Sequence, residues 1–283
     1  MKKSILGNSV NYDGALLGAM PPDLWDAQRA IYYGDSLFES IRVFNGRIPL
    51  MAAHWDRLSG GLKAMRYDVP ASWSADFFEN EILRTTLSSN ARVRLTVWRT
   101  PGGLFLPENN DPRFLITAQG LESSRFQWSE QGLILGFCNS VRLPLDALSG
   151  FKSLNSARYV AAAQEAHARG WDDGIVLNAQ ERVCEATSSN LFWFEGNTLC
   201  TPPLADGCVT GTMRKILLQL RDHHGLGVQE KSATFATVLA ADELFLTNAI
   251  RGIRWVRECE GKVYDCTKTR SLFEQVVEKI RSE

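Results

Sequence analysis

The chain of 283 residues lacks several patterns that mark common protein classes. No apolar run approaches the ~18 residues that a membrane-spanning helix needs. Its six cysteines form no CxxC pair, which argues against a zinc site or a redox motif. A GxSxG elbow, a Walker A loop and a GxGxxG fingerprint are also missing. These absences predict a soluble protein without a metal site and disfavour the common hydrolase and nucleotide-binding classes.

Charge of either sign is not in excess. The 31 basic and 32 acidic residues give a net charge of −1, and the arginines are dispersed. A chain with this charge balance shows no basic segment that would bind nucleic acid or an anionic membrane. The apolar run after the first two lysines is short, and scattered thiols without an export signal fit a reducing compartment. We expect a cytoplasmic protein that acts on small molecules.

Lysine is scarce in the middle of the chain. Positions 64 to 214 hold twelve arginines and a single lysine, Lys152, in the stretch GFKSLNSARY. An amine that forms a Schiff base must be partly unprotonated and oriented, and a semi-buried loop provides both conditions. The simpler alternative is a surface lysine in a loop after Gly150, and the local sequence by itself favours that alternative.

Two further stretches suggest binding groups. In EATSSNLFWF, Glu185 is expected where an apolar strand begins, although a solvated strand-end charge has the same pattern. In CVTGTMRKI, Gly211 and Thr212 open a predicted helix whose free N–H groups suit a phosphate. Because every helix needs a cap, this second signal is weak by itself.

Three further polar side chains are also candidates. Arg57 in AHWDRL is an anion ligand or an ion-pair partner, and Asn248 in TNAIRG ends a predicted strand where backbone amides could reach an anion. Arg99 closes an apolar strand before TPGG, where it could bind a carboxylate through two hydrogen bonds or form a surface ion pair.

The hydrophobic pattern predicts two domains. Apolar residues at helical intervals predict helices over 51–67 and 74–89, and strands are expected over 91–99 and 113–119. Asn45 and Gly46 predict a hairpin turn. We therefore expect a small α+β domain over 1–119, a polar linker over 120–131, and a larger domain over 132–283.

The order of these motifs resembles a known family. GDSLFESIRVFNGR, HWDRL, FKSLNSAR, GIVLN with EATSSNLF, TGTMR and FLTNAIRGI follow one another as in the class IV aminotransferases. These are pyridoxal-phosphate enzymes of fold type IV, which include branched-chain and D-amino-acid aminotransferases and 4-amino-4-deoxychorismate lyases. The resemblance runs from about Arg29 to about Val256. It implies a two-domain α+β or α/β fold like that of D-amino-acid aminotransferase, with pyridoxal 5'-phosphate between the domains, and a homodimer.

The resemblance also implies roles for individual residues. Lys152 would form the Schiff base and move the substrate proton, and Glu185 would pair with the pyridine nitrogen. The phosphate ligands would be Arg57, Gly211, Thr212, Met213, Asn248 and Ala249. The substrate contacts would be Arg99, Phe38 and Glu39.

The implied reaction has two forms. The first is transfer of an amino group between an amino acid and a 2-keto acid, which Glu39 in FES favours. The second is release of pyruvate and 4-aminobenzoate from 4-amino-4-deoxychorismate, which TGTMR and TNAIRG favour. A branched-chain specificity is disfavoured, because Ala157 stands where those enzymes usually carry a tyrosine and Tyr159 lies two residues further on.

Overall fold

The computed structural model describes residues 10–18, 25–220 and 226–282. The chain divides into two units, one formed by residues 1–125 with 151–155 and the other by 126–150 with 156–283. The first boundary falls within the stretch 120–131 that was predicted as a linker. The segment 151–155, which the sequence assigned to the second domain, groups with the first unit. Within the described ranges, no helix is both long and apolar enough to cross a membrane.

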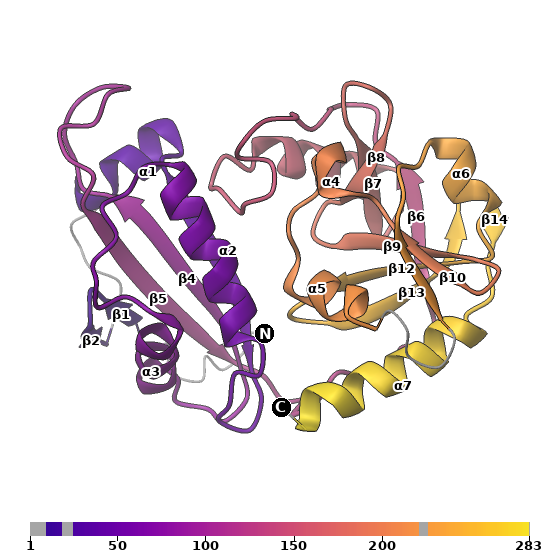
Figure 1. The fold of residues 1–283 in the computed structure, drawn as a ribbon, viewed down its shortest axis with the longest axis horizontal. Helices are drawn as coiled ribbons and strands as arrows, with labels where there is room; N and C mark the ends of the chain where they lie inside the picture. The colour runs from indigo at the N-terminus through magenta and orange to yellow at the C-terminus, as the bar shows by residue number, and fades with distance from the viewer. Residues whose placement is uncertain (1–9, 19–24, 221–225, 283) are drawn as a thin grey trace. The chain divides into compact units, whose positions relative to one another are not determined.

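The first unit is built on an antiparallel sheet with strand order β2-β1-β5-β4-β3 (Figure 1). Its strands are β1 Val10–Tyr12, β2 Ala15–Leu17, β3 Ser36–Val43, β4 Ala91–Arg99 and β5 Pro112–Gly120. Its helices are η1 Trp25–Ala27, α1 Gln28–Tyr33, α2 Met51–Ala64 and α3 Ala75–Thr85.

Alternation along the strands decides which face of this sheet is buried. On β3, Leu37, Ile41 and Val43 are buried, while Phe38 and Ser40 are only partly covered. The buried residues pack with apolar residues of α2 and α3 in one core. Because successive side chains of a strand point to opposite faces, one face of the sheet packs against the helices. The other face remains available for polar and charged side chains.

The predicted local structure of this unit is confirmed. The two helices and the two strands lie within or close to the expected ranges. Asn45 and Gly46 have φ values of 48° and 75°, as a tight hairpin turn requires. The second helix ends before residue 89 because Thr86 is already extended. At its other end, the Ser74 side chain accepts a hydrogen bond from the N–H of Phe77 at 3.0 Å.

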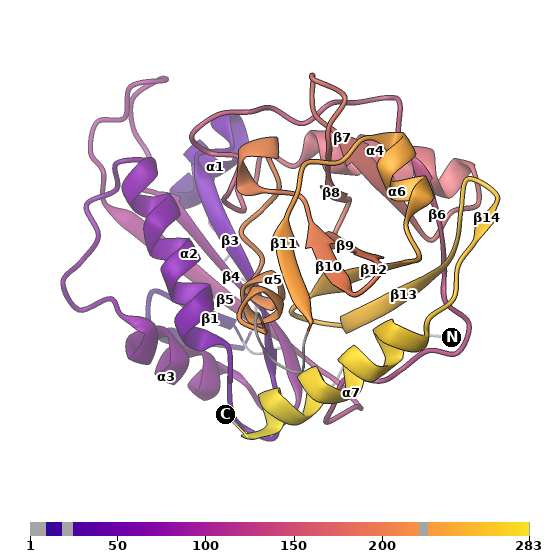
Figure 2. The same ribbon diagram turned by 45° about the vertical axis from the view of Figure 1, so that its right-hand side comes forward.

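The second unit holds a mixed sheet with strand order β11-β10-β9-β12-β13-β6-β7-β8, and β14 pairs with β13. Its strands are β6 Leu133–Phe137, β7 Asp173–Leu177, β8 Val183–Ala186, β9 Asn190–Glu195, β10 Thr198–Thr201, β11 Gly227–Glu230, β12 Glu243–Asn248, β13 Gly252–Cys259 and β14 Lys262–Val263. Its helices are α4 Ala157–Ala168, η2 Leu204–Asp206, α5 Thr212–Leu218, α6 Phe235–Ala240 and α7 Thr267–Ser282. The amphipathic helix α7 lies along β13 in Figure 2 and contacts β12 and β13.

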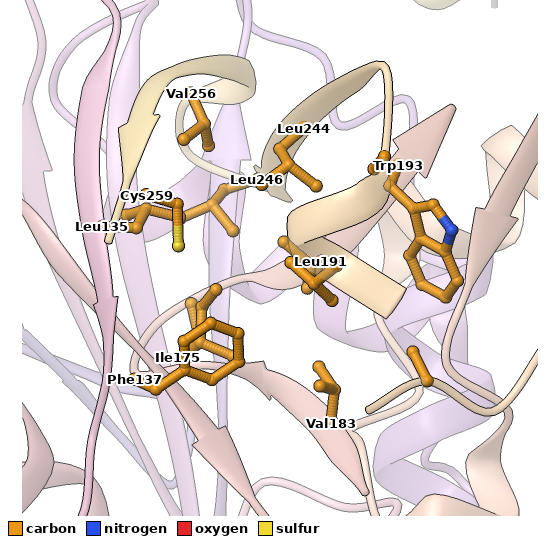
Figure 3. Packing of buried hydrophobic residues seen from close by; sticks show 14 of the residues in the cluster. Leu135, Phe137, Ile175, Val183, Leu191, Trp193, Leu244, Leu246, Val256 and Cys259 are labelled. Atoms are coloured by element: carbon orange, nitrogen blue, oxygen red, sulfur yellow. The ribbon is translucent and has the colours of Figure 1, made fainter. Parts of the chain in front are cut away.

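The core of the second unit forms between strands that are distant in sequence. Figure 3 shows Leu135, Ile175, Leu191, Leu246 and Val256 converging from β6, β7, β9, β12 and β13. Strands buried on both faces read as continuous apolar runs, as NLFWF in β9 does. Strands β7, β9 and β12 of this sheet are thus buried on both faces.

Candidate functional site

Lys152 lies on a short extended segment that pairs with the edge strand β3. The N–H of Phe38 donates to the carbonyl oxygen of Lys152 at 2.8 Å, and the N–H of Leu154 donates to that of Ser36 at 3.2 Å. The Lys152 Nζ lies 4.9 Å from the centroid of the Phe38 ring. The sheet therefore fixes the backbone of this lysine, and its amine lies near an aromatic ring.

The neighbouring Phe151 anchors the same segment on α2. A Cβ added to Gly60 or Gly61 would come within 3.2 Å of the Phe151 ring. These two glycines leave the helix surface low enough for the ring to pack against it. Backbone pairing on one side and ring packing on the other thus hold Lys152 in place.

Glu39 and Arg57 form a buried ion pair. The Arg57 Nε donates to the Glu39 Oε1 at 2.7 Å, and the Arg57 Nη2 donates to the Oε2. The His54 Nδ1 lies 2.7 Å from the same Oε2. His54 and Arg57 are three residues apart on α2, so both face β3. Glu39 is only 1% exposed and Arg57 8% exposed.

The charge state of this cluster follows from its contacts. Burial alone raises the pKa of Glu39, but the charge of Arg57 and hydrogen bonds from Arg57 and His54 outweigh it and lower the pKa to about 2. Burial lowers the pKa of His54, against the opposing effect of Glu39. His54 is therefore neutral and donates from Nδ1 to an ionised carboxylate. This geometry favours a role for Glu39 in orienting Arg57; the substrate contact expected of Glu39 stays a prediction.

Arg94 lies on the outer face of β4, close to Lys152. In the register of β3 with β4 it stands opposite Ser40. Its guanidinium carbon lies 3.9 Å from the centroid of the Phe38 ring, the ring that Lys152 also approaches. Arg94 is exposed. Two cations therefore share one aromatic ring, and one of them is available to an anionic ligand.

Arg99, the predicted substrate arginine, is 4% exposed and surrounded by acceptors. Its Nε and Nη2 donate to the Asp35 carboxylate. Its Nη1 donates to the Asn110 side chain and to the carbonyl oxygen of Arg66, and its Nη2 also donates to the carbonyl oxygen of Met65. The five N–H groups of a guanidinium are thereby all engaged. In this geometry Arg99 joins strand ends together, and its contact with substrate remains a prediction.

Glu185 is the centre of the polar groups in the second unit. It lies on β8, is 3% exposed, and accepts hydrogen bonds on both oxygens. Its Oε1 accepts from the Tyr159 hydroxyl at 2.6 Å. Its Oε2 accepts from the Asn190 Nδ2 and from the N–H of Val209, each at 3.1 Å. These three donors thus hold the buried carboxylate and restrict its orientation.

The place of Glu185 on the strand differs from the expectation. It belongs to β8, and the stretch 187–189 is a turn before β9 begins at Asn190. Asp173 organises this turn, because its carboxylate accepts hydrogen bonds from Thr187 and from the Ser188 hydroxyl. The expectation of a strand start at Glu185 was wrong since small polar residues build the turn after it.

Gly211 and the first residues of α5 lie next to this carboxylate. A Cβ on Gly211 would come within 1.8 Å of the Asn190 Oδ1, so only glycine fits. Asn190 also donates to the carbonyl oxygen of Val209 at 2.8 Å. Its amide therefore joins Glu185 to the turn before α5, where Thr212 and Met213 begin the helix with N–H groups that lack helical acceptors.

Asn248 ends β12, and Ala249 begins the turn that leads to β13. The Asn248 Nδ2 donates to the carbonyl oxygen of Ser188 and to the Ser189 hydroxyl, at 3.2 and 3.0 Å. Its Oδ1 accepts from the N–H groups of Ile250 and Arg251. The Asn248 side chain is thus occupied within the protein, which leaves backbone groups as the expected anion contacts.

The predicted residues therefore fall into two groups. Phe38, Glu39, Arg57 and Lys152 lie together in the first unit, and Glu185 and Gly211 are joined in the second. The interpretation of the sequence missed Arg94, and it did not connect Tyr159 or Asn190 with the carboxylate. Strand alternation could have revealed Arg94, whereas no local signal pointed to the other two contacts.

The residues present fit pyridoxal phosphate. A buried carboxylate that accepts from three donors suits the protonated ring nitrogen of that cofactor, and a lysine amine suits its aldehyde. Gly211 leaves room for the Asn190 amide, and the N–H groups at the start of α5 suit a phosphate.

Comparisons with known proteins agree with this chemistry. The model of the family described as amino-transferase class IV matches residues 36–259. A putative branched-chain-amino-acid aminotransferase from Methanocaldococcus jannaschii is 29% identical over 255 residues, which are 89% of this chain and 88% of the relative.

Solved structures share the fold. The 4-amino-4-deoxychorismate lyase from Pseudomonas aeruginosa is 29% identical, with a TM-score of 0.79 over 92% of this chain and 96% of the lyase. A hypothetical aminotransferase from Mycobacterium tuberculosis, in its PLP-bound form, is 20% identical, with a TM-score of 0.78 over 96% of this chain and 98% of that one. The predicted two-domain type IV fold is confirmed. The chain belongs to the class IV aminotransferase family.

Proposed function

We propose that this protein is a pyridoxal-phosphate-dependent aminotransferase that moves an amino group between an amino acid and a 2-keto acid. The observation that carries the proposal is the buried Glu185 carboxylate with its three donors. A carboxylate that stays ionised keeps a ring nitrogen protonated. The family match and the PLP-bound form of the Mycobacterium tuberculosis structure support the choice of cofactor.

Each residue would have one task. Pyridoxal phosphate supplies an electron sink for the pair left when a bond at the substrate Cα breaks. Lys152 would bind the cofactor covalently, take the Cα proton and later return it. Arg57 would hold the phosphate, and Glu39 and His54 would hold Arg57. The remaining phosphate ligands would be Gly211, Thr212, Met213, Asn248 and Ala249.

Arg94 is our candidate for the substrate carboxylate. It is exposed, and its guanidinium approaches the same Phe38 ring as the Lys152 amine. Arg99 has the same charge, but its donors already have acceptors in the protein. An anion reaching Arg99 would have to displace Asp35, whereas Arg94 offers a guanidinium without that cost.

A homodimer is also part of the proposal. The first unit exposes Leu104, Phe105 and Leu106 at 75%, 89% and 84%, and Ile31 and Tyr32 at 60% and 63%. The Phe105 ring lies 5.4 Å from that of Tyr33, so the loop and α1 form one apolar surface. Clustered apolar side chains of this kind are typical of protein interfaces.

We also propose a cytoplasmic location. All six cysteines lie in the described part of the chain and are free thiols. Five of them are buried. A chain that keeps six thiols without a disulfide suits a reducing compartment.

The second candidate is 4-amino-4-deoxychorismate lyase. The Pseudomonas aeruginosa lyase is as identical to this chain as the Methanocaldococcus relative is, at 29%. The motifs TGTMR and TNAIRG also favour it. The same lysine and carboxylate would serve both reactions, because both begin by breaking a bond at the substrate Cα.

Two measurements test the proposal. Borohydride reduction of the protein with pyridoxal phosphate, followed by peptide mapping, should place the pyridoxyl label on Lys152. Lys152→Ala should abolish the label, and Lys231→Ala, which alters an exposed ion pair with Glu195, should not. A label on another lysine would contradict the assignment. Incubation with a panel of amino acids and 2-oxoglutarate, and separately with 4-amino-4-deoxychorismate, then decides between keto-acid formation and 4-aminobenzoate release.

A further inference from the structure

Tyr159 occupies an unexpected place next to the buried carboxylate. It is the third residue of α4, and its ring packs against the apolar residues around Val176 and Cys184. Its hydroxyl donates to the Glu185 Oε1 at 2.6 Å. The ring is thus held by packing, and the hydroxyl is presented to one oxygen of the carboxylate.

The donors on Glu185 are divided between its two oxygens. Tyr159 serves Oε1, while Asn190 and the N–H of Val209 serve Oε2. A carboxylate with donors on both oxygens has its rotation about the last side-chain bond restricted. Removing the Tyr159 hydroxyl would take away the donor that it presents to Oε1 and so weaken the hold on the carboxylate.

Tyr159 remains a hydrogen-bond donor at neutral pH. Burial raises its pKa, and the negative charge of Glu185 and the hydrogen bond to it raise the pKa further. The phenol therefore keeps its proton and cannot become a second anion beside the carboxylate. Donors to a carboxylate reduce its affinity for a proton. A proton shared between Glu185 and a ring nitrogen would then stay on the nitrogen.

We propose that Tyr159 is a positioning residue whose hydroxyl orients Glu185 and keeps the cofactor's ring nitrogen protonated. This role rests on the proposed pyridoxal-phosphate chemistry. It differs from the position expected for a tyrosine by family resemblance, which is near the ring hydroxyl. Tyr159 acts through the carboxylate, and it affects the reaction by controlling how well the ring accepts electrons.

The test compares Tyr159→Phe with Tyr264→Phe. Tyr264 is a matched control, because its hydroxyl is also buried in the second unit but donates to the carbonyl oxygen of Val238 at 3.3 Å. Both changes remove one buried hydroxyl, and only the first alters Glu185. Any general effect of losing a buried hydrogen bond should therefore appear in both variants.

The first readout is the ¹⁵N resonance of pyridoxal phosphate labelled at its ring nitrogen and bound to each protein. We expect the pyridinium range in the wild type and in Tyr264→Phe, and a shift towards neutral pyridine in Tyr159→Phe. The second readout is steady-state kinetics, with kcat of Tyr159→Phe lowered about tenfold at nearly unchanged KM. If the Phe variant does not fold, Tyr159→Met with Tyr264→Met replaces the pair.

The possible outcomes distinguish a failure of the proposed role of Tyr159 from a failure of the proposed function. An unchanged ¹⁵N resonance and kcat in Tyr159→Phe would overturn the role of Tyr159 while leaving the cofactor chemistry intact. A neutral ring nitrogen in the wild type would overturn it too. If the wild type does not bind pyridoxal phosphate, the proposed function itself has failed. Equal losses in the Tyr159 and Tyr264 variants would show that the hydroxyl serves only stability.

Discussion

Replacing Glu39 with glutamine removes the charge that balances Arg57 in the interior of the first unit. Lowering the Glu39 pKa from 4.5 to about 2 corresponds to about 3 kcal/mol of folding free energy at neutral pH. Leaving one partner of a buried pair uncompensated independently costs about 3–5 kcal/mol. We therefore expect Glu39→Gln to lower the free energy of unfolding at pH 7 by about 3 kcal/mol.

The pH dependence of this loss is the sharper part of the prediction. The folded state holds Glu39 ionised. The stabilisation that the ionised carboxylate gives to the folded state is therefore complete above pH 4.5, and it disappears as the pH falls through about 2. Urea unfolding of the cofactor-free protein at pH 7, 5, 4 and 3 measures the difference between wild type and variant. The difference in the free energy of unfolding between wild type and Glu39→Gln should become smaller between pH 5 and pH 3.

Glu181→Gln is the control for Glu39, since it removes a carboxylate that pairs with Arg142 on the surface. That change should leave stability nearly unaltered at every pH. A Glu39 variant as stable as the wild type at pH 7, or a difference that stays constant down to pH 3, would refute the reasoning.

Three other changes test the site, and a fourth tests the turn after β3. Gly211→Ala should displace the Asn190 amide and weaken pyridoxal-phosphate binding at least about tenfold in a fluorescence titration; unchanged affinity would exclude that contact. Arg94→Ala should raise KM for the amino acid by about tenfold or more and leave the melting temperature unaltered. Arg99→Ala should instead lower the free energy of unfolding by about 3 kcal/mol. The reverse pattern would restore the substrate role to Arg99. Gly46→Ala should cost about 1 kcal/mol in urea unfolding because φ is 75° there, and no loss would show that the turn relaxes.

Strand β4 shows what sequence alone can and cannot provide. The alternation in ARVRLTVWR correctly predicted a strand, and it also orders the side chains by face. Arg99 has the same parity as Val93 and Val97, so it belongs to the buried face. Arg94 belongs to the opposite face. The position of Arg99 at the strand end does not reveal this parity, and the substrate contact predicted for Arg99 stays a prediction.

The surroundings of Glu185 could not be predicted from a local pattern. Its donors Tyr159 and Val209 lie 26 and 24 residues away in the sequence, on α4 and on the turn before α5. Neither separation corresponds to a contact within one helix or between neighbouring residues of a strand. Tertiary packing alone therefore brings these donors to Glu185. Motif order selected Glu185 as a candidate, and only the structure identifies the groups that hold its carboxylate.

The pairing of residues 151–155 with β3 has a consequence for how the chain can be divided. A fragment ending at Arg125 would contain β3 but not the segment that hydrogen bonds to its edge. The complementary fragment from Phe126 would carry Lys152 without the strand that fixes it. Neither half is a self-contained module, so separately produced halves should regain cofactor attachment only after they associate. Lys152 follows Phe126 in the chain, but it groups structurally with the unit that ends at Arg125.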